Sequence, residues 1–164
     1  GSLMWKPGFD HVEREPALIA GLHRSLCVKS HVHRGTPEKP GLVLGLDRGG
    51  SCRGLAYRVD PEKWEETVDY LRGREQVTMV YLERRRMVRL LESRRHVEAT
   101  TYIVDRSHAQ YAGVLDLDHL VTLVRQGEGI SGRCHDYVMN TLAHLREMDI
   151  HDARLELLSK KLNN

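Results

Sequence analysis

The stretch LVLGLDRGGSCRGLAYRVDPEKWEETVDYLRGRE, residues 42–75, carries the signals that decide the fold. Its first six residues are almost wholly apolar and predict a short buried strand. Paired glycines in RGGSCRG, residues 48–54, are typical of a hairpin turn. The alternating GLAYRV, residues 54–59, predicts the returning strand, with Tyr57 and Val59 on one face. The segment therefore predicts two strands that lead directly into a helix.

We expect that helix to run from Asp60 to Glu75. Asp60 is a favourable N-cap, and Pro61 suits the first helical position. One apolar stripe is expected at helical spacing, formed by Trp64, Val68 and Leu71. Gly73 is expected to end or loosen the helix, because glycine is a poor helix former. Glu75 is then predicted to lie at the C-terminus of the helix or just past it.

The same patterns extend outward on both sides. GLHRSLCVKS, residues 21–30, alternates as a strand and carries Arg24 and Ser30 in its apolar register. Later, two alternating runs flank ESRR, residues 92–95, and predict a hairpin. Three amphipathic helices are then expected, over residues 116–126, 133–148 and 152–162. Strands, helix, strands and helices in this order predict an α+β fold: a bent sheet or small β-barrel flanked by helices.

Composition limits the classes of protein that the chain can represent. Its 164 residues suit a single domain, and 40% hydrophobic with 29% charged residues is ordinary for a soluble globular protein. The net charge of +2 is too balanced to predict nucleic-acid binding by charge alone. No apolar run approaches the roughly 20 residues of a membrane helix. Three widely spaced cysteines, Cys27, Cys52 and Cys134, favour a reducing compartment, so we expect a cytoplasmic protein.

Several common site chemistries lack support in the sequence. His31 and His33 form an H-x-H pair, but no CxxC, HExxH or acidic cluster completes a ligand set, so no metal site is predicted. Neither a G-x-S-x-G serine elbow nor a phosphate-binding P-loop is present. Cys134, His135 and Asp136 are adjacent in an expected helix, where successive residues do not face each other. They therefore do not predict a catalytic triad.

An arginine-rich segment covers residues 84–95. It contains Arg84, Arg85, Arg86, Arg89, Arg94 and Arg95. A nucleic-acid or acidic partner is one interpretation of such a cluster. Arginines that alternate out of a strand are more often a solvated face, and we prefer that interpretation.

Glu75 is the carboxyl that stands out from the others. Most acidic residues of the chain fall at helix starts or on solvated faces, whereas Glu75 is expected at the negative end of a helix dipole. The following QVTMVY, residues 76–81, offers no charge to neutralise it. Such a position raises the pKa of a carboxyl, which suits general acid–base catalysis near neutral pH. An exposed glutamate at a fraying helix end is the alternative.

Five blocks of the sequence resemble the ChaC-type γ-glutamylcyclotransferases, in the order of that family. They are GSLMWKPGF (1–9), HRGTPEKPGLVLGLDRGGSCRGLAYRV (33–59), YLRGRE (70–75), TYIVDRSHAQYAG (101–113) and GISGRCHDYV (129–138). The resemblance implies a single domain over residues 1–164, built as a small mixed β-barrel flanked by helices. It also implies cleavage of glutathione to 5-oxoproline and cysteinylglycine, without water, metal or other cofactor, and without a nucleic-acid or membrane partner.

The resemblance also assigns residues to roles. Gly1, Ser2 and Leu3 match the loop whose backbone amides hold the γ-glutamyl group, and Glu75 matches the catalytic glutamate. Further pocket residues are expected in matching segments, namely Ser30, Arg34 and Tyr111. The strand and tyrosine that precede this loop in the family are absent before Gly1, so we expect a domain with its N-terminal strand missing.

Two other functions stay open at this point. The chain could be a cyclotransferase or amine transferase that acts on another γ-glutamyl compound, with shared chemistry and a different leaving-group pocket. It could instead be a basic binding module that uses the arginine-rich segment and turns over no glutathione.

Overall fold

The computed structural model describes all 164 residues, and its elements form two compact groups. We call Ser2–Ser25 with Gly45–His108 the barrel group, and Gly1 with Leu26–Leu44 and Ala109–Asn164 the helical group. Whether residues 1–164 act as the single domain expected from the sequence stays a prediction.

Four strands form a closed barrel in the order β1-β2-β4-β3. They are β1 (Glu13–Ser30), β2 (Gly41–Arg58), β3 (Tyr81–Leu90) and β4 (His96–Val104). β3 pairs antiparallel with β4 and with β1, whereas β2 pairs parallel with β4 through Leu46 and Ile103. The barrel is therefore mixed, and the predicted α+β class with a small mixed barrel is confirmed. The predicted hairpin around residues 92–95 is the β3–β4 connection.

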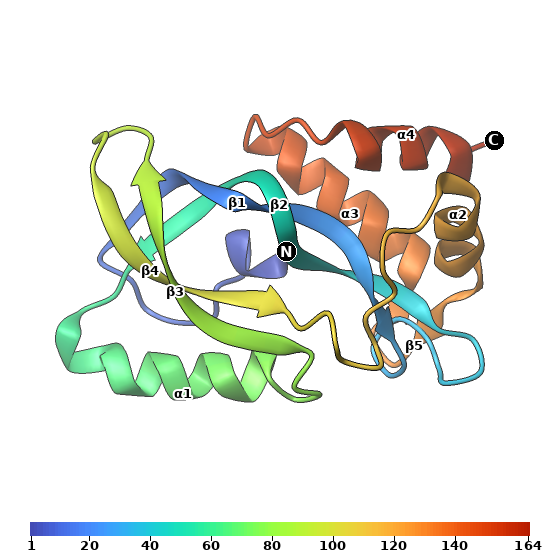
Figure 1. Cartoon of the computed structure of the whole chain (residues 1–164), viewed down its shortest axis with the longest axis horizontal. Coiled ribbons are helices and arrows are strands. Elements are labelled where there is room, and N and C mark those ends of the chain that lie inside the picture. Colours follow the sequence, from blue (N-terminus) through green and yellow to red (C-terminus); the bar gives the residue numbers. More distant parts are fainter. The chain divides into compact units, whose positions relative to one another are not determined.

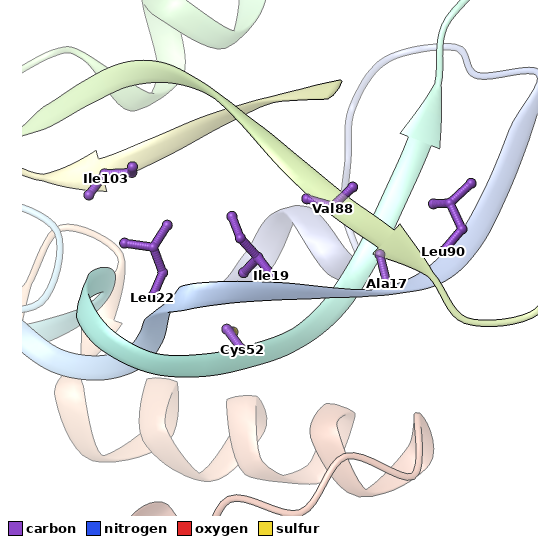
Figure 2. Close-up of a cluster of buried hydrophobic side chains, with 7 residues drawn as sticks. All are labelled: Ala17, Ile19, Leu22, Cys52, Val88, Leu90 and Ile103. Carbon is purple, nitrogen blue, oxygen red and sulfur yellow. The ribbon is translucent and has the colours of Figure 1, made fainter. Parts of the chain in front are cut away.

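The interior of the barrel is filled by small and branched apolar side chains. Figure 2 shows Ala17, Ile19, Leu22, Cys52, Val88, Leu90 and Ile103, contributed by all four strands. Alternate residues of a strand point to the same face, which is why Val88 and Leu90 are buried while Arg89 between them is exposed.

The hairpin expected at residues 48–54 is wrong. β2 runs through this segment without interruption and curves instead of reversing (Figure 1). Gly49 and Gly50 have φ values of +104° and +66°, a backbone region that glycine alone enters without strain. Glycines of this kind mark sharp bends within barrel strands as well as turns between strands. The paired glycines therefore form a bend within β2, and the expected reversal of the chain does not occur.

The expected helix before Glu75 is confirmed, with two differences in detail. A short 3₁₀ turn, η2 (Pro61–Lys63), precedes α1 (Trp64–Glu75), and the Asp60 side chain accepts a hydrogen bond from the Glu62 amide. Gly73 lies inside α1 and does not end it. Trp64 is exposed, so the predicted stripe is wrong at its first position, and Thr67 is buried beside Val68 instead.

The helical group contains the three remaining long helices. They are α2 (Leu117–Gln126), α3 (Cys134–Glu147) and α4 (Ala153–Leu162), and they confirm the three predicted segments. Each packs against the other two (Figure 1). A small two-stranded sheet, β5 (Glu128–Gly129) with β6 (Gly132–Arg133), lies between α2 and α3 in the sequence. None of the helices combines the length and apolarity that spanning a membrane requires.

Candidate active site

Glu75 is the last residue of α1, as the sequence predicted. Its side chain is only 20% exposed. Burial raises the pKa of the Glu75 carboxyl, and the Arg74 guanidinium, with Nε 3.3 Å from Oε1, opposes that rise in pKa only in part. The sequence predicts no neutralising charge after Glu75, and the cation that pairs with it in the structure is the residue before it, Arg74. A carboxyl with this pKa can accept and return a proton closer to neutral pH than an exposed glutamate can.

Arg74 connects Glu75 to the first residues of the chain. Its Nη2 donates to Ser2 Oγ at 2.9 Å. Its Nη1 donates to the carbonyl oxygens of Lys6 and Pro7, each at 2.9 Å, and lies 3.2 Å from Tyr70 Oη. One guanidinium therefore contacts both the segment that begins at Ser2 and the predicted catalytic carboxyl.

Residues Ser2–Met4 form a 3₁₀ turn, η1. The amides of Trp5 and Lys6 both donate to the Ser2 carbonyl oxygen, at 3.2 and 2.8 Å, and close the turn. Tyr57 on β2 donates its hydroxyl to the carbonyl oxygens of Leu3 and Met4, at 3.2 and 2.8 Å. Amides at the start of a helical turn have no acceptor within the turn. This geometry suits the predicted role of Ser2 and Leu3 in presenting backbone N–H groups.

Aromatic packing holds Tyr57 in this position. Phe9 and His11 meet the Tyr57 ring edge-on, at centroid distances of 5.6 and 4.9 Å. Burial raises the pKa of the Tyr57 hydroxyl, which therefore stays protonated and able to donate.

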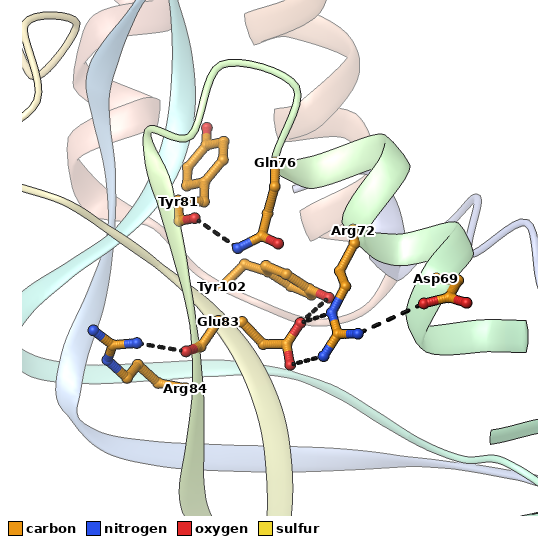
Figure 3. A network of polar contacts seen from close by, with 7 residues as sticks. All are labelled: Asp69, Arg72, Gln76, Tyr81, Glu83, Arg84 and Tyr102. Carbon is orange, nitrogen blue, oxygen red and sulfur yellow. Dashed lines mark hydrogen bonds and ion pairs between the residues drawn. The ribbon is translucent and has the colours of Figure 1, made fainter. Parts of the chain in front are cut away.

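A second polar network joins α1 to β3 and β4 (Figure 3). Arg72 donates to both carboxylate oxygens of Glu83 on β3, from Nε at 2.9 Å and from Nη2 at 3.0 Å. Tyr102 on β4 donates to Glu83 Oε2 at 3.3 Å. These donors, with Arg72 first, lower the pKa of the Glu83 carboxyl. Burial, followed by the charge of Glu83, raises the pKa of Tyr102, and the charge of Glu75 adds to this rise in pKa.

Three predicted pocket residues belong to the helical group. Ser30 ends β1, is buried, and accepts a hydrogen bond at Oγ from the Arg34 amide at 3.0 Å. The Arg34 guanidinium donates to the carbonyl oxygens of Ser131 and Arg133 and lies over the Tyr137 ring, 5.3 Å from its centroid. The structure thus brings Ser30 and Arg34 together. These contacts give Arg34 a structural role, and its place in the substrate pocket stays a prediction.

Tyr111 is held beside the end of β1. It forms an antiparallel backbone bridge with Val28, and the Lys29 amide donates to the Gln110 carbonyl oxygen at 2.8 Å. Gly1, the other member of the helical group among the predicted residues, is exposed. The substrate-binding roles of Gly1 and Tyr111 stay predictions.

His33 and Cys134, which the sequence did not predict to form a metal site or a catalytic triad, both have partners nearby. His33 Nδ1 lies 2.9 Å from Ser131 Oγ. Cys134 Sγ is buried and lies 3.2 Å from both the amide and the carbonyl oxygen of Leu42, and burial raises the pKa of its thiol. A thiol held in this way is not an activated nucleophile.

Comparison with known proteins shows which family this chain belongs to. The model of the ChaC-like protein family matches residues 1–164, the entire chain. The chain belongs to the ChaC-like family.

Curated ChaC-like relatives share the name of one activity. The glutathione-specific γ-glutamylcyclotransferase of Escherichia coli K12 is 30% identical over 152 residues, which cover 93% of this chain and 65% of that protein. Glutathione-specific γ-glutamylcyclotransferase 1 of Danio rerio is 29% identical over 162 residues, covering 94% of this chain and 82% of the relative. This chain thus spans slightly less than two thirds of the length of its bacterial relative.

A solved structure confirms the ChaC-like fold. A γ-glutamyl cyclotransferase specific to glutathione from yeast superposes with a TM-score of 0.89 at 23% identity. The match covers 99% of this chain and 93% of the yeast chain. At this identity the likeness establishes the shared fold.

Sequence reasoning missed two residues of this candidate site, Arg74 and Tyr57. Arg74 was visible inside YLRGRE, the block that matches the family, but nothing in its spacing indicated which acceptors it would reach. Tyr57 was assigned to the apolar face of a strand, which is correct for its ring and says nothing of its hydroxyl. The available signal was that a tyrosine on a buried face usually needs a partner for its hydroxyl.

Proposed function

We propose that this chain is a glutathione-specific γ-glutamylcyclotransferase, a carbon–nitrogen lyase that converts glutathione to 5-oxoproline and cysteinylglycine. The observation that carries the proposal is the half-buried Glu75 carboxyl, with its raised pKa, joined through Arg74 to the turn at Ser2. The names of the curated relatives support glutathione as the substrate.

The reaction takes its nucleophile from the substrate. The α-amino nitrogen of the γ-glutamyl group attacks the γ-carbonyl carbon, and a five-membered lactam closes. A serine or cysteine nucleophile is therefore unnecessary, which suits a chain whose Cys134 thiol is buried and bonded to Leu42. Holding the γ-glutamyl arm folded gives the ring closure a large intramolecular advantage.

Glu75 solves the proton problem of this reaction. An α-ammonium group with a pKa of about 7.7–8.0 is mostly protonated at neutral pH and cannot attack. Ionised Glu75 removes its proton, and the tetrahedral intermediate forms. The protonated carboxyl gives this proton to the departing amide nitrogen as the C–N bond breaks. Glu75, ionised again, then removes the second proton from the nitrogen that has attacked, which leaves the neutral lactam, and passes it to the amino group of the released cysteinylglycine. One carboxyl thus acts as base and then as acid, and every proton is returned.

The turn at Ser2–Met4 supplies the electrostatic part of the mechanism. As the γ-carbonyl oxygen becomes an oxyanion, it needs donors that are already oriented. Backbone N–H groups of the segment Gly1 to Leu3 are our candidates, because Tyr57 holds the turn by its carbonyl oxygens and leaves the amides to face elsewhere. We keep Ser30, Arg34 and Tyr111 as proposed substrate contacts.

We also propose that the reaction takes place in the cytoplasm. All three cysteines are free and buried, which suits a reducing compartment in which glutathione is abundant as the thiol.

Incubating the purified protein with glutathione and measuring 5-oxoproline and cysteinylglycine tests the proposal. We expect equimolar products, no effect of a metal chelator, and much slower turnover of other γ-glutamyl amines. Faster turnover of another γ-glutamyl amine would show that this amine, and not glutathione, is the preferred substrate. Absence of turnover, together with salt-sensitive retention on heparin or RNA, would instead favour a basic binding module.

A further inference from the structure

We propose that Arg74 is a positioning residue, whose single guanidinium fixes the Ser2–Pro7 loop and the Glu75 carboxylate in one geometry. The inference rests on the proposed function, because it assigns Arg74 a part in the same reaction. All the residues involved lie in the barrel group.

The donors of Arg74 are divided between two tasks. Nη1 and Nη2 reach Ser2 Oγ and the carbonyl oxygens of Lys6 and Pro7, all at 2.9 Å. Nε alone faces Glu75 Oε1, at 3.3 Å. The rigid fork of a guanidinium can hold several acceptors at fixed angles, which a lysine ammonium cannot do. The loop is therefore bound by the same group that flanks the carboxyl.

The approach of the loop to α1 is close enough to restrict its sequence. Gly8 follows the loop with a φ of +78°, and a Cβ atom built there would overlap the hydroxyl of Tyr70. Tyr70 Oη is itself 3.2 Å from Arg74 Nη1. The guanidinium, the tyrosine hydroxyl and the glycine backbone thus form a packed junction in which Arg74 carries the charge.

This placement assigns Arg74 an effect on protonation in addition to packing. Arg74 is 23% exposed and lies beside Glu75, so its positive charge favours the ionised carboxyl against burial. The positive charge of the amino terminus also favours the ionised Glu75 carboxyl. Tyr102 interacts with Glu75 as well, and it stays neutral because its own pKa is raised. Removing Arg74 therefore raises the pKa of Glu75 further, whereas a residue that only packs would leave that pKa unchanged.

Arg74→Met and Arg74→Lys separate the two tasks, with Arg85→Met as the matched control. Arg85 is an exposed arginine of β3 whose ion pair with Glu98 contacts neither the loop nor Glu75. For Arg74→Met we expect kcat/KM for glutathione to fall at least about tenfold, because hydrogen bonds to a charged group are lost. We also expect the acid limb of its pH profile to move to higher pH.

Arg74→Lys keeps the charge and loses the fork. Its acid limb should stay near that of the wild type, while KM rises because the loop is no longer held. Carboxyl-carbon NMR titration of Glu75 in each variant measures the protonation effect without any assay of activity.

The outcomes separate this inference from the proposed function. A wild-type protein without turnover of any γ-glutamyl compound removes the proposed function, and the NMR titration then decides the role of Arg74 alone. Wild-type kcat/KM in Arg74→Met, or an unshifted Glu75 titration in a folded Arg74→Met protein, would overturn the inference. An upward shift in Arg74→Met that is absent in Arg85→Met and reduced in Arg74→Lys would support it.

Discussion

Two glutamates of the barrel group lie near the end of α1, and their pKa values are shifted in opposite directions. Glu83 receives two parallel hydrogen bonds from Arg72 and a third from Tyr102, so its pKa falls. Glu75 meets Arg74 through Nε only, at 3.3 Å, and burial raises its pKa. Each of the two carboxyls forms an ion pair with an arginine. Burial is the leading cause of the pKa shift at Glu75, whereas hydrogen bonding from Arg72 is the leading cause at Glu83, so the two pKa values move in opposite directions.

The comparison explains why Glu75 suits catalysis and Glu83 suits structure. A carboxylate that is fully satisfied by a bidentate arginine is a poor base, because its lone pairs are occupied and its ionised form is stabilised. Arg74 donates its other hydrogen bonds to the Ser2–Pro7 loop, so it orients Glu75 without occupying both oxygens of the carboxylate. Arginine thus stabilises the Glu83 carboxylate fully and the Glu75 carboxylate only in part.

The largest expected effect comes from Glu75→Gln, which keeps the shape of the side chain and removes its proton transfer. We expect the rate of 5-oxoproline formation to fall by at least about 10²-fold, the usual contribution of general acid–base catalysis. Glu65→Gln at the exposed start of α1 is the matched control and should retain activity. Near-wild-type release of cysteinylglycine by a folded Glu75→Gln protein would remove Glu75 from the mechanism.

The pH dependence of the wild type should show the next largest effect. Glu75 must be ionised to accept a proton, and its pKa is raised by burial. The value of kcat/KM should therefore fall as pH drops, about tenfold per unit, with a midpoint above the ordinary glutamate pKa of about 4.3. An acid limb that starts below this pKa would show that Glu75 is not the titrating base.

A smaller effect is expected when the Glu83 network is broken by Arg72→Met. The free energy of unfolding should fall slightly at neutral pH, since the pair is bidentate but half-exposed. Arg85→Met, which breaks a more exposed single contact, should cost less. Chemical denaturation of the three proteins measures both differences.

The sign of the pH effect on that difference follows from the lowered pKa of Glu83. A carboxyl whose pKa is lowered by folding contributes stability above its pKa in the unfolded chain, about 4.3. This contribution is lost as the pH falls through the pKa of the folded state. The wild type and Arg72→Met should therefore become equally stable in acid. A difference that is constant down to low pH would mean that packing, and not the ion pair, is responsible.

Much of the fold was predictable because it is written in local patterns. The β3–β4 hairpin, α1 and the three later helices follow from alternation, helical spacing and N-caps such as Asp60. The course of β2 was not predictable in this way. Left-handed glycines at Gly49 and Gly50 permit either a turn or a bend, and the choice depends on closing the barrel with strands distant in the sequence.

The sequence predicted the candidate catalytic carboxyl, Glu75, but not the contacts of Arg74 that hold it in place. The position of Glu75 at a helix end predicts a raised pKa; the direction of the shift is confirmed, but its leading cause is burial and not the helix end. The role of Arg74 depends on acceptors about 70 positions earlier in the sequence, at Ser2, Lys6 and Pro7, which no local pattern connects to it. The substrate roles of Gly1, Ser2, Leu3, Ser30, Arg34 and Tyr111 remain predictions.

The most direct test is a carboxyl-carbon NMR titration that follows Glu75 and Glu83 in the same wild-type sample. The two carboxyls are chemically identical, so the comparison isolates the effect of their surroundings. We predict that Glu75 titrates above the ordinary glutamate pKa of about 4.3 and Glu83 below it. A Glu75 carboxyl that titrates at or below the pKa of Glu83 would contradict the account.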